Sequence, residues 1–141
     1  MISSLAVVVF SHQQHWFGLE SSFVRARGLC SLHRRNLPLV PFSALLPEVE
    51  SDKKPLEPKE WLQLSAAKIG TGAGGDWLLG LAGEVDLLEL PASCISILPP
   101  LLHERRLFSP IQALALYQGR LITLLNCHEL AAMASKIDLD Q

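Results

Sequence analysis

The feature that most constrains the fold is a pattern that occurs twice, at Leu29 to Leu45 and again at Leu114 to Leu130. Each copy predicts a strand, a tight polar turn, a second strand and the start of a helix. Arg35 of the first copy corresponds to Arg120 of the second, after the turn, and Leu45 corresponds to Leu130 in the helix. The apolar residues of the second strand are Leu37, Leu39 and Val40 in the first copy and Ile122, Leu124 and Leu125 in the second. Two similar units of this kind predict two similar subdomains.

The apolar content of the chain restricts where it can reside. With 141 residues the chain has single-domain length, and 49% of its residues are apolar. No stretch approaches the roughly 20 apolar residues that span a bilayer. The N-terminal MISSLAVVVF lacks a basic region and has too short an apolar run for a secretory signal, so we expect a first strand there and a cytoplasmic protein. The remaining apolar residues predict a generous core and exposed patches that bind partners.

Charge and cysteine usage argue against several classes of protein. The formal charge of −2 gives no clustered basic surface for nucleic acid, and the local arginines lack interleaved aromatic residues. Cys30, Cys94 and Cys127 are odd in number and far apart, which fits neither a disulfide framework nor the spacing of a zinc site. We expect them to be small buried hydrophobic residues in a reducing compartment.

Strand-length apolar runs and turn residues predict the other elements. Residues 5–10 and 15–19 form a hairpin across the polar turn 11–14, and residues 21–27 form a short helix or an irregular stretch. The later predicted elements are strands at 61–69, 77–81 and 85–90 with a bend at Gly83-Glu84, a hairpin of 111–117 and 120–125 around Gln118-Gly119, and a helix capped by Asn126 that runs to about Ser135. We divide the single domain 1–141 into a first barrel portion (1–47), a proline-rich and charged linker (48–60), and a second barrel with a C-terminal helix (61–141).

The order of these elements resembles the CheW-like domain, the adaptor module of bacterial chemosensory arrays. Residues 28–45 align without a gap to the signature of the family's first half. Residues 77–91 (WLLGLAGEVDLLELP) are similar to its later strand pair, and residues 113–130 are similar to its closing segment. The matching positions in the first half are Gly28, Leu29, Leu32, Arg35, Pro38 and Leu45. The resemblance covers the chain from about Leu5 to Ala134.

The resemblance implies an all-β fold with short helices, in which two small SH3-like or OB-like barrels pack together before a short C-terminal helix. It also implies a non-enzymatic adaptor in chemotaxis signal transduction that needs no cofactor or metal. The implied partners are the regulatory domain of a CheA-type histidine kinase, a chemoreceptor tip or another CheW-like protein, with pairing of the chain to itself left open. Nucleic acid binding and membrane insertion are not expected.

Three departures from the family pattern lie in the first half. His33-Arg34 replaces Arg-Gly at the hairpin tip, and Pro41 replaces an aspartate before the helix. Compared with the family pattern, a further strand and loop are missing between Leu19 and Gly28. These departures predict a truncated first barrel. An alternative function follows from them: a divergent CheW-like protein that has lost receptor contact and serves pilus motility, polar localisation or self-association.

Two motifs match functional sites in part, and we favour a structural interpretation of each. Gly70, Gly72 and Gly75 match the GxGxxG pattern of a nucleotide-binding protein, but the next segment is strand-like and no βαβ unit flanks it, so we expect a flexible turn. The pairs His12 with His15 and Cys127 with His128 lack the ligand spacing of a metal site.

No set of nucleophile, base and orienting group suggests an enzyme. Glu84, Asp86 and Glu89 alternate with apolar residues as on the solvated face of a strand, and no serine lies in a GxSxG elbow. Trp16, Trp61 and Trp77 are more typical of a core than of a site. The residues that we predict to contact a partner are His33, Arg34 and Arg35 at the first hairpin tip, and Trp77, Leu79 and Leu81 on the strand of the second half.

Overall fold

A computed structural model describes residues 3–32, 37–46, 57–65, 76–105 and 108–138. These residues form strands and short helices, which confirms the predicted all-β fold with short helices. No helix among them is long and apolar enough to cross a membrane. In chain order the elements are β1 (Ser4–His12), β2 (His15–Glu20), η1 (Ser21–Phe23), β3 (Val24–Leu29), η2 (Cys30–Leu32), β4 (Leu39–Pro41), α1 (Phe42–Leu45), β5 (Glu60–Leu64), β6 (Trp77–Leu81), β7 (Val85–Pro91), η3 (Ala92–Cys94), β8 (Ile95–Ile97), α2 (Pro100–Arg105), β9 (Ile111–Tyr117), β10 (Arg120–Leu125) and α3 (Cys127–Asp138).

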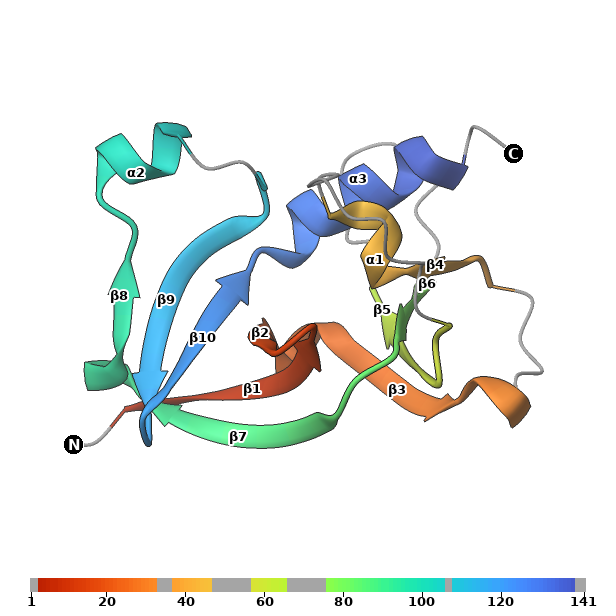
Figure 1. Cartoon of the computed structure of the whole chain (residues 1–141), viewed down its shortest axis with the longest axis horizontal. Helices are drawn as coiled ribbons and strands as arrows, with labels where there is room; N and C mark the ends of the chain where they lie inside the picture. The colour runs from red at the N-terminus through yellow and green to blue at the C-terminus, as the bar shows by residue number, and fades with distance from the viewer. Residues whose placement is uncertain (1–2, 33–36, 47–56, 66–75, 106–107, 139–141) are drawn as a thin grey trace.

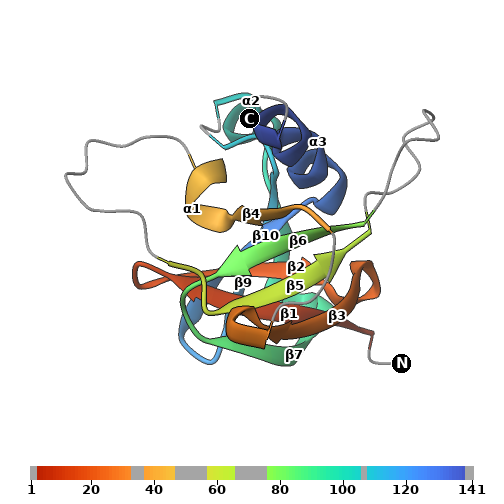
Figure 2. The same ribbon diagram turned by 90° about the vertical axis from the view of Figure 1, so that its right-hand side faces the viewer.

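The strands form two sheets (Figure 1). A six-stranded sheet has the order β7-β1-β2-β10-β9-β8, and a four-stranded sheet has the order β3-β5-β6-β4. Most neighbours are antiparallel, but β10 runs parallel to β2 and β4 runs parallel to β6. Figure 2 looks onto the four-stranded sheet and shows α1 and α3 on the same side of it, where the two helices contact each other.

Each sheet combines strands from both sides of residues 48–60. The hairpin β1–β2 pairs with β7 through one edge and with β10 through the other. In the same way the hairpin β5–β6 pairs with β3 and β4. The division into portions 1–47 and 61–141 therefore does not follow the sheets, because the backbone groups at the edges of each hairpin find their hydrogen-bond partners in the other half of the chain.

The predicted repeat is visible in the parallel strand pairs. Val40 of β4 lies beside Leu79, and Leu125 of β10, its counterpart in the repeat, lies beside Leu19. All four side chains are buried in one cluster. A helix follows each of these strands, α1 after β4 and α3 after β10. The second strand and the helix of each copy are therefore as predicted.

The first copy does not contain the predicted hairpin. Its first strand, β3, ends at Leu29 and leads into the 3₁₀ turn η2, and β3 and β4 lie at opposite edges of the four-stranded sheet. The strand β3 also corrects the prediction that residues 21–27 are helical or irregular and that a strand is missing after Leu19. Its residues alternate between half-buried and exposed, with Arg25 and Arg27 on the exposed side, so no apolar run marked it.

The local turn and cap signals are confirmed in the second copy. β9 and β10 form an antiparallel hairpin, and Gln118 and Gly119 between them have φ values of 51° and 76°. Positive φ at both turn positions matches the twist of a two-residue hairpin. The Glu129 backbone N–H donates to Asn126 Oδ1 at 3.0 Å, which caps α3.

Two apolar clusters hold the fold together. The central cluster takes side chains from both sheets, α1 and α3, and its aromatic rings include Phe42 in edge contact with Phe10, Phe17 and Phe108. The sheet-interior cluster belongs to the six-stranded sheet alone. The buried members of the central cluster are Val8, Phe10, Leu19, Val40, Phe42, Leu45, Leu62, Leu64, Trp77, Leu79, Leu81, Phe108, Leu125, Cys127, Leu130, Ala131 and Ala134. Those of the sheet-interior cluster are Val7, Val9, Leu90, Ala113, Ala115, Ile122 and Leu124.

Candidate partner-binding surfaces

The predicted contact residues on β6 lie in the core. The exposed fractions of Trp77, Leu79 and Leu81 are 5%, 0% and 1%. β6 also lies between β5 and β4, so both of its edges are hydrogen-bonded. In this structure a partner reaches neither the leucine side chains nor the strand edge. The other predicted contacts, His33 to Arg35, lie outside the described residues.

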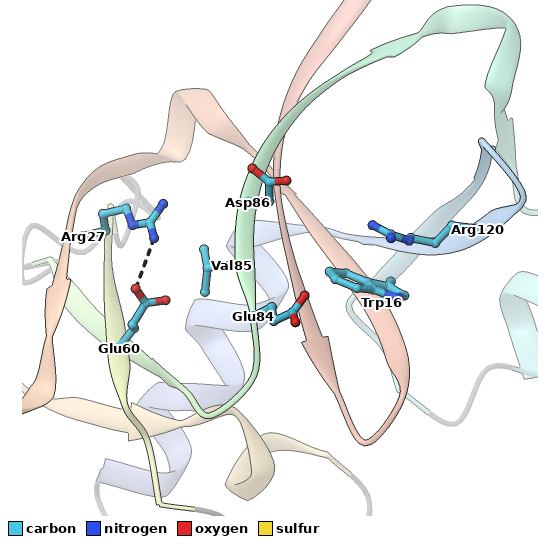
Figure 3. Close-up of a pocket in the computed structure, with 7 residues that line it drawn as sticks. All are labelled: Trp16, Arg27, Glu60, Glu84, Val85, Asp86 and Arg120. Atoms are coloured by element: carbon cyan, nitrogen blue, oxygen red, sulfur yellow. Dashed lines mark hydrogen bonds and ion pairs between the residues drawn. The ribbon is translucent and has the colours of Figure 1, made fainter.

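An open groove runs between the two sheets and has a volume of about 440 Å³ (Figure 3). On one side Arg27 of β3 makes an ion pair with Glu60 of β5, with 3.1 Å between Nη2 and Oε1. The opposite side carries Trp16 of β2 and Arg120 of β10. The residues that line the groove are Trp16, Arg27, Glu60, Glu84, Val85, Asp86 and Arg120. The groove is therefore polar and is built by both sheets.

Arg120 is held by an aromatic ring. Its guanidinium carbon lies 4.0 Å from the centroid of the Trp16 ring, within the range of a cation–π contact. Among the described residues no carboxylate lies within ion-pair distance of this guanidinium. Stacking orders the side chain while its N–H groups stay available, so Arg120 offers a preorganised cation to a partner.

The two hairpin turns of the six-stranded sheet frame a second groove of about 520 Å³. Because β2 and β10 are parallel, the turn that precedes β2 and the turn that precedes β10 lie at the same end of the sheet. The residues that line this groove are Gln14, His15, Trp16, Gln118, Gly119, Arg120, Leu121 and Thr123. Its lining contains no carboxylate, and Arg120 and Trp16 belong to both grooves.

A pair of exposed leucines adjoins the second groove. Leu116 of β9 and Leu121 of β10 lie directly opposite each other, with exposed fractions of 62% and 57%. Exposed leucines on adjacent strands form an apolar contact surface, as the composition predicted. Leu121 follows Arg120 directly in β10, so the two leucines and the Trp16–Arg120 pair lie on opposite faces of the hairpin end. We call these four residues, Trp16, Arg120, Leu116 and Leu121, the hairpin-end surface.

The titratable side chains near the core are shifted toward their neutral forms. Burial, followed by Glu20, raises the pKa of the Cys127 thiol to about 12. Burial, followed by Glu60, also raises the pKa of Cys30, whereas burial and then His15 lower the pKa of His12. Cys127 is buried as predicted, while Cys30 and Cys94 are only half-buried. The described residues hold no cluster of three or more metal-ligating side chains, and Gly70 to Gly75 lie outside them.

The carboxylates of β7, together with Glu84 just before it, lie where the sequence predicts a solvated face. Glu84, Asp86 and Glu89 are all exposed. The apolar residues between these carboxylates are not all buried, because Leu87 is also 60% exposed. β7 ends the six-stranded sheet, so a residue there has a neighbouring strand on one side only.

Comparison with known proteins rests on structure alone, because no family model and no curated protein matches the sequence. Among solved structures, the scaffolding protein TtCheW from Thermoanaerobacter tengcongensis matches with a TM-score of 0.64 over 91% of this chain and 92% of that chain, at 14% sequence identity. The fold is CheW-like. The CheW-like fold confirms the architecture that the sequence resemblance implied.

In this CheW-like fold the hairpin-end surface is the feature that the sequence did not reveal. Arg120 was part of the repeat, and Trp16 stood out as an aromatic residue, but nothing local connected them. Their contact depends on the parallel pairing of β2 with β10, which aligns Trp16 with Ile122. Parallel pairing joins segments that are far apart in sequence and leaves no turn signal between them.

Proposed function

We propose that this protein is a non-enzymatic cytoplasmic adaptor in chemosensory signal transduction. It couples the regulatory domain of a CheA-type histidine kinase to a chemoreceptor or to another CheW-like module. The observation that supports this role is the CheW-like fold, which extends over 91% of the chain and is shared with a scaffolding protein. Scaffolds act through complementary surfaces and need no catalytic group.

The hairpin-end surface suits such a partner. Leu116 and Leu121 present apolar area, and burial of a leucine side chain contributes about 1.5–3 kcal/mol. Arg120, ordered by Trp16, lies on the opposite face of β10 from Leu121, where it can pair with a carboxylate of a partner that wraps around the end of the hairpin. A partner that presents apolar side chains to one face of the hairpin end and an acidic side chain to the other would satisfy both groups. Aromatic and arginine residues are enriched among interface hot spots.

Direct binding measurements test the adaptor role. The purified chain would be titrated by calorimetry with a CheA regulatory domain and, separately, with a receptor-tip fragment. We expect binding to the kinase domain, and binding to the receptor fragment if the receptor contact is retained. Binding to the kinase domain alone would favour the variant that has lost receptor contact. Binding to neither would refute the adaptor role.

Substitutions locate the contact. Leu121→Glu should weaken kinase-domain binding at least about tenfold, because it replaces an apolar contact with a charge that requires solvation. Leu87→Glu is the matched control, because Leu87 is 60% exposed but lies on β7, outside the hairpin-end surface. Equal losses from both variants would refute the assignment of this surface.

Residues His33 to Arg35 remain a second proposed contact. His33 and Arg34 stand where the family carries its arginine-glycine tip, and Arg35 follows them, so we propose that these residues contribute to partner binding. The double variant Arg34→Ala with Arg35→Ala should lower affinity for the kinase domain or the receptor fragment. Unchanged affinity for both in a folded variant would remove this part of the proposal.

A further inference from the structure

The strand β8 ends the six-stranded sheet, and within the described residues it pairs with β9 alone. Its other edge has no partner strand in the part of the chain that the structure describes. Figure 1 shows β8 and α2 together at the end of the molecule that lies away from the four-stranded sheet. An open edge presents unpaired backbone N–H and C=O groups that can pair with another strand.

The four outer strands of the two sheets differ in how their edges are protected. β7 carries Asp86 and Glu89, β3 carries Arg25 and Arg27, and β4 ends in Pro41, which has no N–H to donate. Charged side chains and prolines are the usual means by which proteins discourage pairing at an edge. β8, with the sequence Ile-Ser-Ile, has neither.

The surface around β8 is apolar. Ile97 is 81% exposed, and Leu101 and Leu102 of α2 are 59% and 54% exposed. Pro99 and Pro100 between them are also exposed, and no aspartate, glutamate, lysine or arginine occurs from residue 90 to residue 103. The three large side chains alone expose on the order of 350 Å², nearly half of the roughly 800 Å² that each partner contributes to a stable interface.

We propose that β8 and α2 form a symmetric interface between two copies of this chain. The two β8 strands pair antiparallel about a two-fold axis at Ser96, which joins the six-stranded sheets of both copies. In this register Ile95 lies opposite the partner's Ile97, and Ile97 lies opposite the partner's Ile95. Cross-strand pairs of β-branched residues stabilise such pairing, and an uncharged apolar surface is complementary to a copy of itself.

The geometry of the segment limits this pairing to a dimer. β8 has only three residues, and Pro99 and Pro100 follow two residues after its end. Since prolines cannot donate a backbone hydrogen bond, the paired region cannot extend along the chain in that direction. Among the described strands of each molecule, β8 alone has such an unprotected edge, so the contact closes after two molecules. The dimer does not depend on the adaptor role, because its surface is separate from the hairpin-end surface.

Sedimentation measurements on the full chain test the dimer. We expect a monomer–dimer equilibrium that Ile97→Asp weakens at least roughly thirty-fold, as for a central hot spot, because the symmetry places two charges near the axis. Leu87→Asp, a comparably exposed leucine on β7, should leave the equilibrium unchanged. A wild-type chain that stays monomeric at millimolar concentration would refute the proposal. Equal effects of the two substitutions would also refute it.

Crosslinking tests the position of the axis. In a chain with Cys30 and Cys94 replaced by serine, Ser96→Cys should form a disulfide-linked dimer on mild oxidation, because residues opposite each other in antiparallel strands have Cα atoms about 4.5–5.5 Å apart. Ser93→Cys, three residues away and equally exposed, should not crosslink. Crosslinking through Ser93→Cys alone, or assembly beyond dimers, would overturn the two-fold arrangement.

Discussion

The exchange of strands between the two halves predicts an unusual response to cleavage of the chain. A recognition sequence for a site-specific protease would be inserted between residues 46 and 57, and the purified protein would be cut there. If each half formed its own barrel, the products would be two folded pieces that separate. Because β1–β2 pairs with β7 and β10, and β5–β6 pairs with β3 and β4, we expect the products to remain associated.

The buried side chains give the scale of this association. Seven described side chains of the first half are at most 5% exposed: Val7, Val9, Phe10, Leu19, Val40, Phe42 and Leu45. Each contributes about 1.5–3 kcal/mol on burial, or about 10–20 kcal/mol together. Association of two separate pieces costs about 4–15 kcal/mol. The midpoints of these two ranges differ by about 5.5 kcal/mol, which corresponds to a dissociation constant of about 0.1 mM.

Gel filtration and thermal unfolding of the cut protein provide the assay. At about 1 mM, well above that dissociation constant, the cut protein should elute as one species with the circular dichroism of the intact chain. Its melting temperature should fall on dilution, because unfolding now separates two molecules. The intact chain should show no more than the weaker concentration dependence of its own dimerisation. Two separate species, each with folded spectra, would refute the interleaved arrangement.

Three further predictions concern single residues. Gly28→Ala should lower the free energy of unfolding by about 1–3 kcal/mol in chemical denaturation, because an added Cβ would lie 2.5 Å from Cζ2 of the buried Trp61. An unchanged free energy of unfolding would show that the Trp61 ring moves aside freely. Asn126→Ala should cost about 0.5–2 kcal/mol by removing the cap of α3, and Asn126→Asp should retain most of that stability. Burial lowers the pKa of His12 below 6.5, so the unfolded chain binds this proton more readily than the folded chain does. The contribution of neutral His12 to the stability of the folded protein is therefore complete above pH 6.5 and falls as the pH drops. In melting temperatures measured against pH, His12→Gln should flatten this dependence.

The parts of the fold that the sequence revealed depend on local signals. The β9–β10 hairpin has a Gln-Gly turn between two apolar runs, and α3 begins with a capping asparagine, so each could be recognised within about ten residues. β3 has no such signal, because its arginines interrupt the apolar pattern. One of them, Arg25, makes an ion pair with Asp76, with 3.3 Å between Nε and Oδ2. That partner lies far along the chain and could not be inferred from neighbouring residues.

The candidate site was harder to infer than the fold. Trp77 to Leu81 form an unbroken apolar run, and all five residues of β6 are buried. A continuous run of this kind is typical of a strand covered on both faces, so the prediction that it contacts a partner gave too little weight to its pattern. The sequence pattern does not predict that Leu116 and Leu121 are exposed, because their neighbours Ala115 and Ile122 are equally apolar and yet buried.

The exchange of strands also links the grooves to the core. Arg27 and Glu60 belong to the four-stranded sheet, whereas Trp16 and Arg120 belong to the six-stranded sheet. The central cluster joins these sheets, with side chains such as Leu125 from one and Leu79 from the other. We therefore expect a change in its packing to alter the width of the groove between the sheets without touching a residue that lines it. The hairpin-end surface lies within one sheet, where β9, β10 and β2 are hydrogen-bonded in series. A partner that binds only this surface should tolerate such repacking, while one that spans the groove should lose affinity.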